Sequence, residues 1–297
     1  FTVTVTARDA FANTATGYGG TVHFTSTDPG AVLPADYAFT AGDAGVHAFT
    51  NGVTLTSGSR TVTATDTATS SVTGTTGTIV VAAAGSSTAL SGPSSSVFGQ
   101  AVSFTATVTP GGPGTPTGTV DFLDGAATLC AAVPLNGSAQ ASCPASSLAV
   151  GAHPLSARYN GDATFAASTS AALAHSVGQA ATTTAITGHT PDPATTLQSI
   201  TVTATVSVDP PGAGTPTGTV TVSDGTGATC TITLPATSCS LSPTSAGPKT
   251  LVATYGGDAS FAGGVSAGVP QSVTAVTTFS GATATGTGTA TATLTGA

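Results

Sequence analysis

The chain has 297 residues, of which 38 are Gly and 18 are Pro, and only 5% are charged. It contains no Glu and no Met, and because strong helix formers are scarce, an all-β fold is expected. The formal net charge is −8 and the four basic residues are scattered singly, which excludes the cationic surface that nucleic-acid binding requires.

Residues 1–83 alternate apolar and polar positions in the way that is typical of half-buried strands. The inward positions are expected at Val3, Val5, Ala7, Val22, Phe24, Val53, Leu55, Val62 and Ala64. Because the chain opens in mid-strand at Phe1, we expect it to be a portion of a longer protein. Four acidic residues of this segment could bind calcium at its loops, although none lies in an alternating acidic loop: Asp9, Asp28, Asp36 and Asp43.

Residues 84–178 carry several strand and turn signals in order. Val102, Phe104, Ala106 and Val108 alternate with Ser and Thr, which predicts a strand with one buried face. The motif Gly-Thr-Pro-Thr-Gly-Thr-Val follows at residues 114–120, and Asp124-Gly125 predicts a hairpin turn. Further along, residues 159–165 read Tyr-Asn-Gly-Asp-Ala-Thr-Phe, after the inward set Leu155, Ala157 and Tyr159.

Residues 179–276 repeat this pattern. The motif Gly-Thr-Pro-Thr-Gly-Thr-Val recurs at residues 214–220, Asp224-Gly225 repeats the hairpin signal, and residues 255–261 read Tyr-Gly-Gly-Asp-Ala-Ser-Phe. The sequence therefore contains two copies of one structural unit.

These motifs, in this order and twice over, resemble the group 3 family of bacterial immunoglobulin-like domains. Residues 1–83 are similar to a different, invasin-like bacterial immunoglobulin module, through Ala7-Arg8-Asp9 and the segment Thr-Val-Thr-Ala-Thr-Asp at residues 61–66. The resemblance implies tandem immunoglobulin-like β-sandwiches at residues 1–83, 84–178 and 179–276. Short linkers at residues 82–87 and 177–180 favour an extended rod.

Residues 277–297 alternate Thr with Ala and Gly. This pattern is typical of one or two strands, so the segment is interpreted as the start of an incomplete fourth unit. A flexible tail is the alternative.

The four cysteines form two pairs at equivalent places in the two repeats. We predict intradomain disulfides between Cys130 and Cys143 and between Cys230 and Cys239, each worth about 3 kcal/mol by the chain-entropy estimate. Disulfides imply an oxidising, extracellular or cell-surface location. The alternative is that the cysteines bind zinc, but the pairs lack Cys-x-x-Cys spacing and have no histidine near them in the sequence.

The Tyr-x-Gly-Asp segments contain the most suggestive polar residues. We expect Asp162 and Asp258 to cap backbone N–H groups of a turn, and Tyr159 and Tyr255 to anchor a corner by hydrogen-bonding back to the main chain. The alternative for Asp162 and Asp258 is calcium binding, together with Asp124 or Asp224 from a neighbouring loop.

No catalytic motif appears in the sequence. The chain has no His-Glu-x-x-His, Gly-x-Ser-x-Gly or phosphate-loop pattern, so we expect neither an enzyme nor a cofactor. Its five histidines are dispersed, and each is expected at the surface or at a strand end: His23, His47, His153, His175 and His189. No apolar run reaches the roughly 20 residues that a membrane-spanning helix needs, so direct membrane insertion is not expected.

The sequence thus predicts a non-enzymatic repeat region of an extracellular bacterial surface protein or fibre. Two versions are open: a stalk among flanking immunoglobulin-like domains, or the subunit of a filament that assembles head to tail by strand addition. The alternative function is an adhesin that binds a glycan or a protein through loops at one end of a sandwich.

Overall fold

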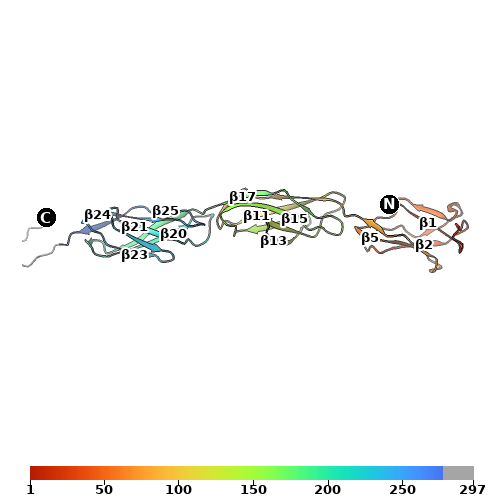
Figure 1. Ribbon diagram of the computed structural model, residues 1–297. Helices are drawn as coiled ribbons and strands as arrows, with labels where there is room; N and C mark the ends of the chain where they lie inside the picture. Colours follow the sequence, from red (N-terminus) through yellow and green to blue (C-terminus); the bar gives the residue numbers. More distant parts are fainter. Residues whose placement is uncertain (277–297) are drawn as a thin grey trace, which may run out of the picture. The chain divides into compact units, whose positions relative to one another are not determined.

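The computed structural model describes residues 1–276, which form strands joined by turns and contain no α-helix (Figure 1). The only helical segment among these residues is a short 3-10 turn, η1 (Ala41–Asp43). The all-β prediction is therefore confirmed, and the alternating β-branched side chains explain it, because they fit a pleated surface better than a helix. The predicted strands at residues 277–297 lie outside the described residues.

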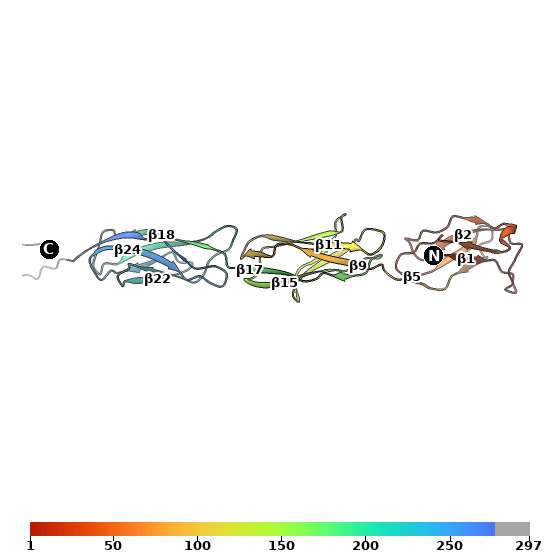
Figure 2. The ribbon, with the colours of Figure 1, turned by 90° about the horizontal axis from the view of Figure 1, so that it is seen from above.

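Each of the two repeats has two sheets, and the first module has a four-stranded sheet and two two-stranded pairs around a shared core (Figures 1 and 2). One sheet has the order β3-β2-β6-β7, the other pairs β1 with β4, and β5 pairs with β8. The strands of this module are β1 (Val3–Thr6), β2 (Thr21–Ser26), β3 (Tyr37–Ala38), β4 (Val46–Phe49), β5 (Gly58–Arg60), β6 (Val62–Asp66), β7 (Thr73–Thr75) and β8 (Ile79–Val81).

Aromatic side chains fill the core of the first module. Phe24 of β2 and Phe49 of β4 meet edge to face across the two sheets, with ring centroids 4.7 Å apart. Phe39 and Val62 are buried beside them. Edge-to-face pairs add about 0.5–1.5 kcal/mol beyond the area they bury, which supports a small module with short strands.

The strand predicted around Val53 and Leu55 is wrong. Thr54 forms only an isolated bridge with Val32, through backbone hydrogen bonds of 2.9 and 3.0 Å. Val53 is nevertheless buried. The alternating pattern predicted the burial of Val53 correctly. It did not predict the absence of a strand, because an apolar side chain can be buried without a neighbouring strand that pairs with its backbone.

The second module, which is the first repeat, has sheets of order β14-β11-β9 and β10-β17-β15-β12-β13, with β16 beside β15. Its strands are β9 (Ser86–Ser91), β10 (Ser95–Val97), β11 (Val102–Pro110), β12 (Thr119–Asp124), β13 (Ala127–Pro134), β14 (Gln140–Ala145), β15 (Gly151–Tyr159), β16 (Ser168–Thr169) and β17 (Leu173–Gly178). Phe104, Ala106 and Val108 of β11 are buried as their alternation predicts.

The third module has the same topology, with sheets β18-β20-β23 and β19-β26-β24-β21-β22 and with β25 beside β24. Its strands are β18 (Thr182–Thr190), β19 (Ala194–Thr195), β20 (Ile200–Val208), β21 (Thr219–Ser223), β22 (Thr229–Thr233), β23 (Ser238–Leu241), β24 (Gly247–Tyr255), β25 (Gly264–Val265) and β26 (Val269–Thr274). Ile200, Val202 and Ala204 of β20 form the buried face.

The opening segment of each repeat contributes to both sheets. In the second module β9 pairs with β11 in one sheet, and β10 then joins the other sheet beside β17. In the third module β18 pairs with β20, and β19 then lies parallel to β26. One segment thus covers an edge of each sheet on the same side of the sandwich.

The first module shares this strand order without an opening segment of that kind among the described residues. Its order β4-β1 corresponds to β14-β11, and its order β7-β6-β2-β3 corresponds to β17-β15-β12-β13. No described strand pairs with the second edge of β1 or of β7. Two unpaired strand edges therefore lie on the same side of this sandwich.

Candidate functional site

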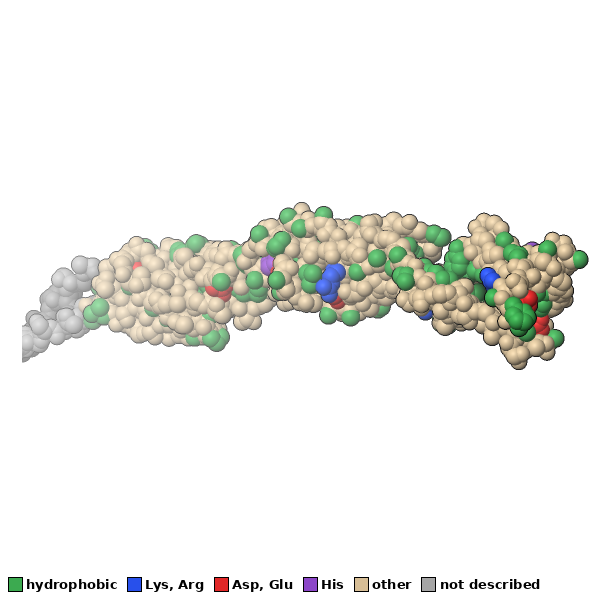
Figure 3. Space-filling view, turned by 45° about the vertical axis from the view of Figure 1, so that its right-hand side comes forward, with side chains coloured by type: hydrophobic (Ala, Val, Ile, Leu, Met, Phe, Trp, Pro, Cys, Tyr) green, Lys and Arg blue, Asp and Glu red, His purple; other side chains and the backbone are tan. Residues whose placement is uncertain are grey.

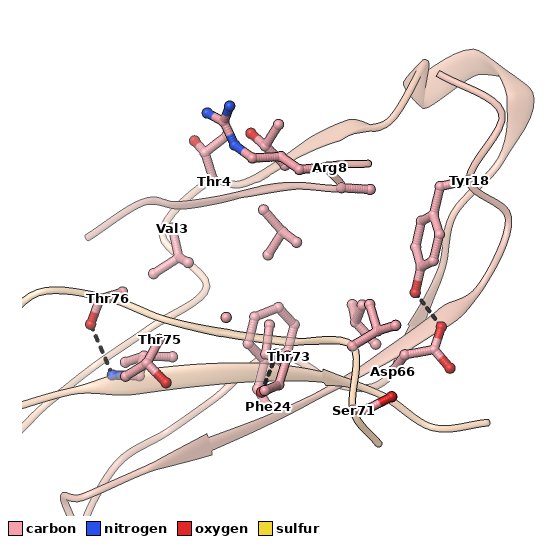
Figure 4. A pocket seen from close by; sticks show the side chains of 18 of the residues that line it. Val3, Thr4, Arg8, Tyr18, Phe24, Asp66, Ser71, Thr73, Thr75 and Thr76 are labelled. Atoms are coloured by element: carbon pink, nitrogen blue, oxygen red, sulfur yellow. Dashed lines mark hydrogen bonds between the residues drawn. The ribbon is translucent and has the colours of Figure 1, made fainter. Parts of the chain in front are cut away.

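An open groove lies between β1 and β7 of the first module (Figure 4). Its volume is about 600 Å³, and it is lined by the residues of β1, the residues around β7 and core side chains of β2 and β6. Figure 4 shows Val3 and Thr4 on one side of the groove, Thr75 and Thr76 on the other, and Phe24 at its floor. The groove thus has an apolar floor and two rims of strand backbone.

Gly74 leaves the inner face of β7 uncovered. It lies opposite Ala64 in the β6–β7 ladder, and Ala64 packs against the core. Because directly opposed residues share a face of a sheet, position 74 faces inward. A Cβ atom built at Gly74 has no neighbour within 4 Å, so there is free space beside it.

A buried carboxylate closes one end of the groove. The Tyr18 hydroxyl donates a hydrogen bond to Asp66, whose other oxygen accepts from the backbone N–H groups of Ala68 and Thr69, each at 2.8 Å. Burial raises the pKa of Tyr18 to about 12, and the hydrogen bond to Asp66 adds to the effect. Sequence reasoning missed this pair, although Asp66 continues the inward spacing of Val62 and Ala64.

The two Tyr-x-Gly-Asp segments build the same corner in both repeats. The Oδ2 atom of Asp258 accepts hydrogen bonds from the backbone N–H of Thr217 at 2.8 Å and from its hydroxyl at 2.6 Å. The Oδ1 atom accepts from the N–H groups of Ser260 and Phe261, each at 2.8 Å. The carboxylate thereby joins the Gly-Thr-Pro-Thr-Gly motif to the turn before Phe261.

Asp162 makes the equivalent contacts with Thr117, Thr164 and Phe165. Desolvation acts to raise the pKa of Asp162, but the hydrogen bonds from the backbone of Thr117, Phe165 and Thr164 outweigh it and lower the value to about 2. The same balance at Asp258 lowers its pKa to about 2. Both carboxylates are therefore held ionised by the turn itself.

The two corner tyrosines are almost completely buried. The Tyr255 hydroxyl donates to the carbonyl of Thr217 at 2.8 Å, which fixes the corner to the main chain. The Tyr159 hydroxyl is buried without a hydrogen-bond partner among the described residues, so the predicted bond from Tyr159 to the main chain is wrong. Burial, followed by the interaction with Asp162, raises the pKa of Tyr159 to about 12.

Each repeat has one disulfide, as predicted from the cysteine positions. Cys130 on β13 bonds to Cys143 on β14, and Cys230 on β22 bonds to Cys239 on β23. Since β13 and β14 belong to different sheets, as do β22 and β23, each bridge joins the two layers of its sandwich.

The expectation that every histidine lies at the surface or at a strand end is wrong for His175. Its side chain is 2% exposed within β17, where Nδ1 contacts the carbonyl of Pro93 and Nε2 contacts the hydroxyl of Ser96, each at 2.9 Å. The spacing from His175 to the buried Val177 was the available signal, because residues two apart on a strand share a face. His153, whose Nδ1 lies 2.6 Å from Oδ2 of Asp124, is partly buried nearby.

The third module places different polar residues at these two positions. Lys249 and Gln271 are opposed in the β24–β26 ladder and are buried. The Oε1 atom of Gln271 lies 2.7 Å from Nδ1 of His189, and the Nε2 amide group of Gln271 donates a hydrogen bond to Oδ1 of Asp192 at 3.0 Å. Both repeats therefore have buried polar side chains with hydrogen-bond partners at this end of the core.

The carboxylates considered for calcium binding each contact protein groups of their own. Asp124 lies against His153, and the buried Asp224 accepts hydrogen bonds from the N–H groups of Thr226 and Ala228 at 2.8 and 3.0 Å. Within residues 1–276 no group of three or more His, Cys, Asp and Glu side chains is placed to hold a metal ion.

The acidic residues of the first module also serve local contacts. Asp28 accepts from the backbone N–H groups of Gly30 and Thr56 and lies 3.8 Å from Arg60. The other three make separate contacts: Asp9 with Asn13, Asp36 with His23 of β2, and Asp43 with Thr40 and with His47 of β4.

A family model described as "Bacterial Ig-like domain (group 3)" matches residues 88–178 and 186–276. No curated protein sequence matches the chain. Across residues 1–276, no helix has the length and apolar character to cross a membrane.

The chain is similar to several solved structures at low identity. Escherichia coli alpha-2-macroglobulin activated by porcine elastase is 10% identical with a TM-score of 0.28, and the match covers 92% of this chain but only 31% of that one. A putative membrane anchored protein from Corynebacterium diphtheriae is 13% identical with a TM-score of 0.25 and coverages of 92% and 84%. Three N-terminal domains of the bacteriophage RB49 outer capsid protein Hoc are 14% identical with a TM-score of 0.24 and coverages of 93% and 95%.

Proposed function

The chain belongs to the bacterial Ig-like domain (group 3) family, and we propose that it is a non-enzymatic spacer of an extracellular bacterial surface protein. In this role the modules hold another part of the protein away from the cell. The observation that carries the proposal is the duplication of a self-contained unit, because each repeat has its own core and its own disulfide between the two sheets.

The disulfides support an extracellular location. Bridges persist in oxidising compartments and are rare in the cytosol. They are also useful to a small sandwich outside the cell, because a bridge between layers restrains the unfolded chain and opposes separation of the sheets.

The surface composition supports a mechanical role. On the face shown in Figure 3, Lys, Arg and Asp side chains are few. Arg158 is paired with Asp121 at 2.9 Å, so that its charge is offset locally. A Thr- and Ser-rich surface with few charges offers little for electrostatic recognition, since steering a charged ligand requires charges that act together.

Small-angle X-ray scattering of the full chain tests the spacer. A single compact body of 297 residues would have a radius of gyration of roughly 19 Å. We expect a radius clearly above that value, unchanged when salt is added. A radius near that of the compact body would overturn the proposal, because folded-back modules could not separate two points.

The adhesin alternative predicts a different result. A binding module would retain a glycan or a protein from the host surface at a single end of one sandwich. Binding of the full chain to a glycan array, abolished by substitutions in one loop, would favour the adhesin over the spacer.

A further inference from the structure

We propose that the two repeats bear tension along the chain, and that each is held at its entrance by a latch: Ala84 against residues 164–166 in the second module, and Ala180 against residues 260–262 in the third. The inference rests on the spacer proposal only for the source of the load, since a spacer attached at both ends is pulled when those ends move apart. It goes beyond that proposal because it gives the duplicated motifs a mechanical role.

The latch of the third module is built on two backbone hydrogen bonds to one residue. The Ala180 N–H donates to the carbonyl of Ser260 at 3.0 Å, and the Ala180 carbonyl accepts from the N–H of Ala262 at 2.9 Å. Ala180 is completely buried, so water has no direct access to it. Two residues further on, the Thr182 hydroxyl donates to the carbonyl of Ala262 at 2.8 Å, which adds a third contact with the same turn.

The second module has the same latch. Ala84 donates to the carbonyl of Thr164 and accepts from the N–H of Ala166, each at 2.8 Å. The Ser86 hydroxyl, in the place of Thr182, donates to the carbonyl of Ala166 at 2.7 Å. Because β9 begins at Ser86 and β18 begins at Thr182, the latched residue lies ahead of the first strand in each repeat. The chain is therefore fixed to each repeat before its first strand begins.

The latch is oriented to resist sliding. Ala84 forms a parallel bridge with Phe165, and Ala180 forms a parallel bridge with Phe261. Beyond Phe165 and Phe261 the chain continues into β17 and β26, the last strands of the two repeats. Tension pulls the latched residue backward and the last strand forward, so two parallel segments are drawn past each other. Both backbone bonds of the latch are then loaded together, and such a pair resists more force than bonds that open one after the other.

The corner carboxylate holds the turn that forms the latch. Oδ1 of Asp258 accepts from the N–H of Ser260, and the carbonyl of Ser260 in turn holds Ala180. The Asp258 N–H donates to the carbonyl of Phe261 at 2.9 Å, which closes the turn. Oδ2 of Asp258 accepts from the N–H of Thr217, in the segment before β21. Force on Ala180 is therefore passed to two segments of the sandwich and not to one free loop.

The disulfides fix how much chain a repeat can release under force. The bridged cysteines are 13 residues apart in the second module and 9 residues apart in the third. The enclosed residues cannot extend while the bridge is intact, even when the rest of the repeat is unfolded. With Cα atoms 6.0 and 5.9 Å apart across the bridges, a reductant should lengthen the extended chain by about 40 Å for the second module and about 25 Å for the third. This difference identifies each repeat in a pulling experiment.

Force spectroscopy of single full-length chains, held at their two ends, tests the inference. Ala262→Pro removes the N–H that donates to Ala180, and we expect it to lower the unfolding force of the third module to about half, because one of the two backbone bonds is lost. The second module of the same molecule should keep its force. The equivalent substitution Ala166→Pro should transfer the loss to the second module.

Ile232→Val is the matched control. It removes one methyl group from a buried position of β22, which lies outside the latch. Denaturation of both variants measures their loss of stability, which we expect to be comparable. The control should nevertheless keep the unfolding force of the unaltered third module. A purely structural role of the latch would instead lower the force in both variants alike.

A change in the point of attachment tests the latch without altering it, and it decides the question if Ala262→Pro fails to fold. Thr187 is exposed on β18, beyond the latch. Pulling between the thiol of Thr187→Cys and the C-terminal end leaves the latch formed but outside the loaded path. We expect the third module to unfold at a clearly lower force in this geometry than when the chain is pulled from its two ends.

Three outcomes would overturn the inference. They are an unchanged force in Ala262→Pro, an equal loss of force in Ile232→Val, and equal forces for the two points of attachment. None of them changes the radius of gyration of the unloaded chain, which alone tests the spacer, so the two proposals fail separately.

Discussion

The carboxylate of Asp162 holds Thr117 by two bonds at once, accepting from its backbone N–H at 2.7 Å and from its hydroxyl at 2.8 Å. Thr117 lies in the Gly-Thr-Pro-Thr-Gly motif, and Asp162 lies in the turn after β15. The two most recognisable motifs of each repeat are therefore the two halves of one hydrogen-bonded corner.

Replacing this carboxylate should destabilise the second module. In Asp162→Ala the N–H groups of Thr117, Thr164 and Phe165 lose their acceptor, and we expect the free energy of unfolding to fall by about 2 kcal/mol. Chemical denaturation of the full chain measures this. Asp36→Ala is the control, because Asp36 is exposed and contacts only the His23 side chain, and little change is expected there. Equal effects of the two substitutions would contradict the role of the corner.

Acid should destabilise both repeats through the same residues. Folding lowers the pKa of Asp162 and Asp258 from the ordinary value of 3.8 to about 2, so the unfolded chain takes up these protons first as the pH falls. The stabilisation is complete above the ordinary value and is lost as the pH drops toward 2, by about 1–2 kcal/mol for each carboxylate.

Thermal unfolding at a series of pH values checks this prediction. The double variant Asp162→Asn and Asp258→Asn should be less stable at neutral pH and should lose less stability on acidification. An unchanged acid dependence in that variant would assign the effect to other carboxylates.

Breaking one disulfide should affect one repeat. Replacing Cys130 and Cys143 by Ala removes the bridge between β13 and β14, and we expect a loss of about 3 kcal/mol confined to the second module. Hydrogen exchange of the full chain localises the change. With both pairs replaced, adding a reductant should have no further effect, and a remaining response to reductant would contradict the assignment.

The buried His175 should tolerate glutamine better than leucine. Gln occupies the equivalent position of the third module as Gln271, and its amide can both donate and accept. In His175→Gln the Pro93 carbonyl and the Ser96 hydroxyl can keep partners, so we expect a loss below about 1 kcal/mol. In His175→Leu both lose their partner, and about 2–3 kcal/mol is expected from unpaired buried polar groups. Denaturation midpoints of the two variants measure the difference, and a more stable leucine variant would refute it.

The sequence alone determined the strands of the two repeats, the duplication and the cysteine pairing, because each is encoded locally. A period of two assigns the buried faces of β11 and β20, and two cysteine pairs at equivalent places in a duplicated unit suggest two bridges. The same reasoning placed Asp162 and Asp258 in turns, since a carboxylate after Gly has nearby N–H groups to accept from.

Only the tertiary structure decided which edges pair and which side chains meet. Alternation says that Val3 and Val5 face inward, but it does not say that Val3 lies opposite Phe49 of β4, which packing decides. The burial of His175 beside Ser96, the pairing of Tyr18 with Asp66 and the groove at Gly74 arise in the same way. Each results from strands distant in sequence packing together, and a pattern that repeats every two residues carries no information about which distant strand will be the neighbour.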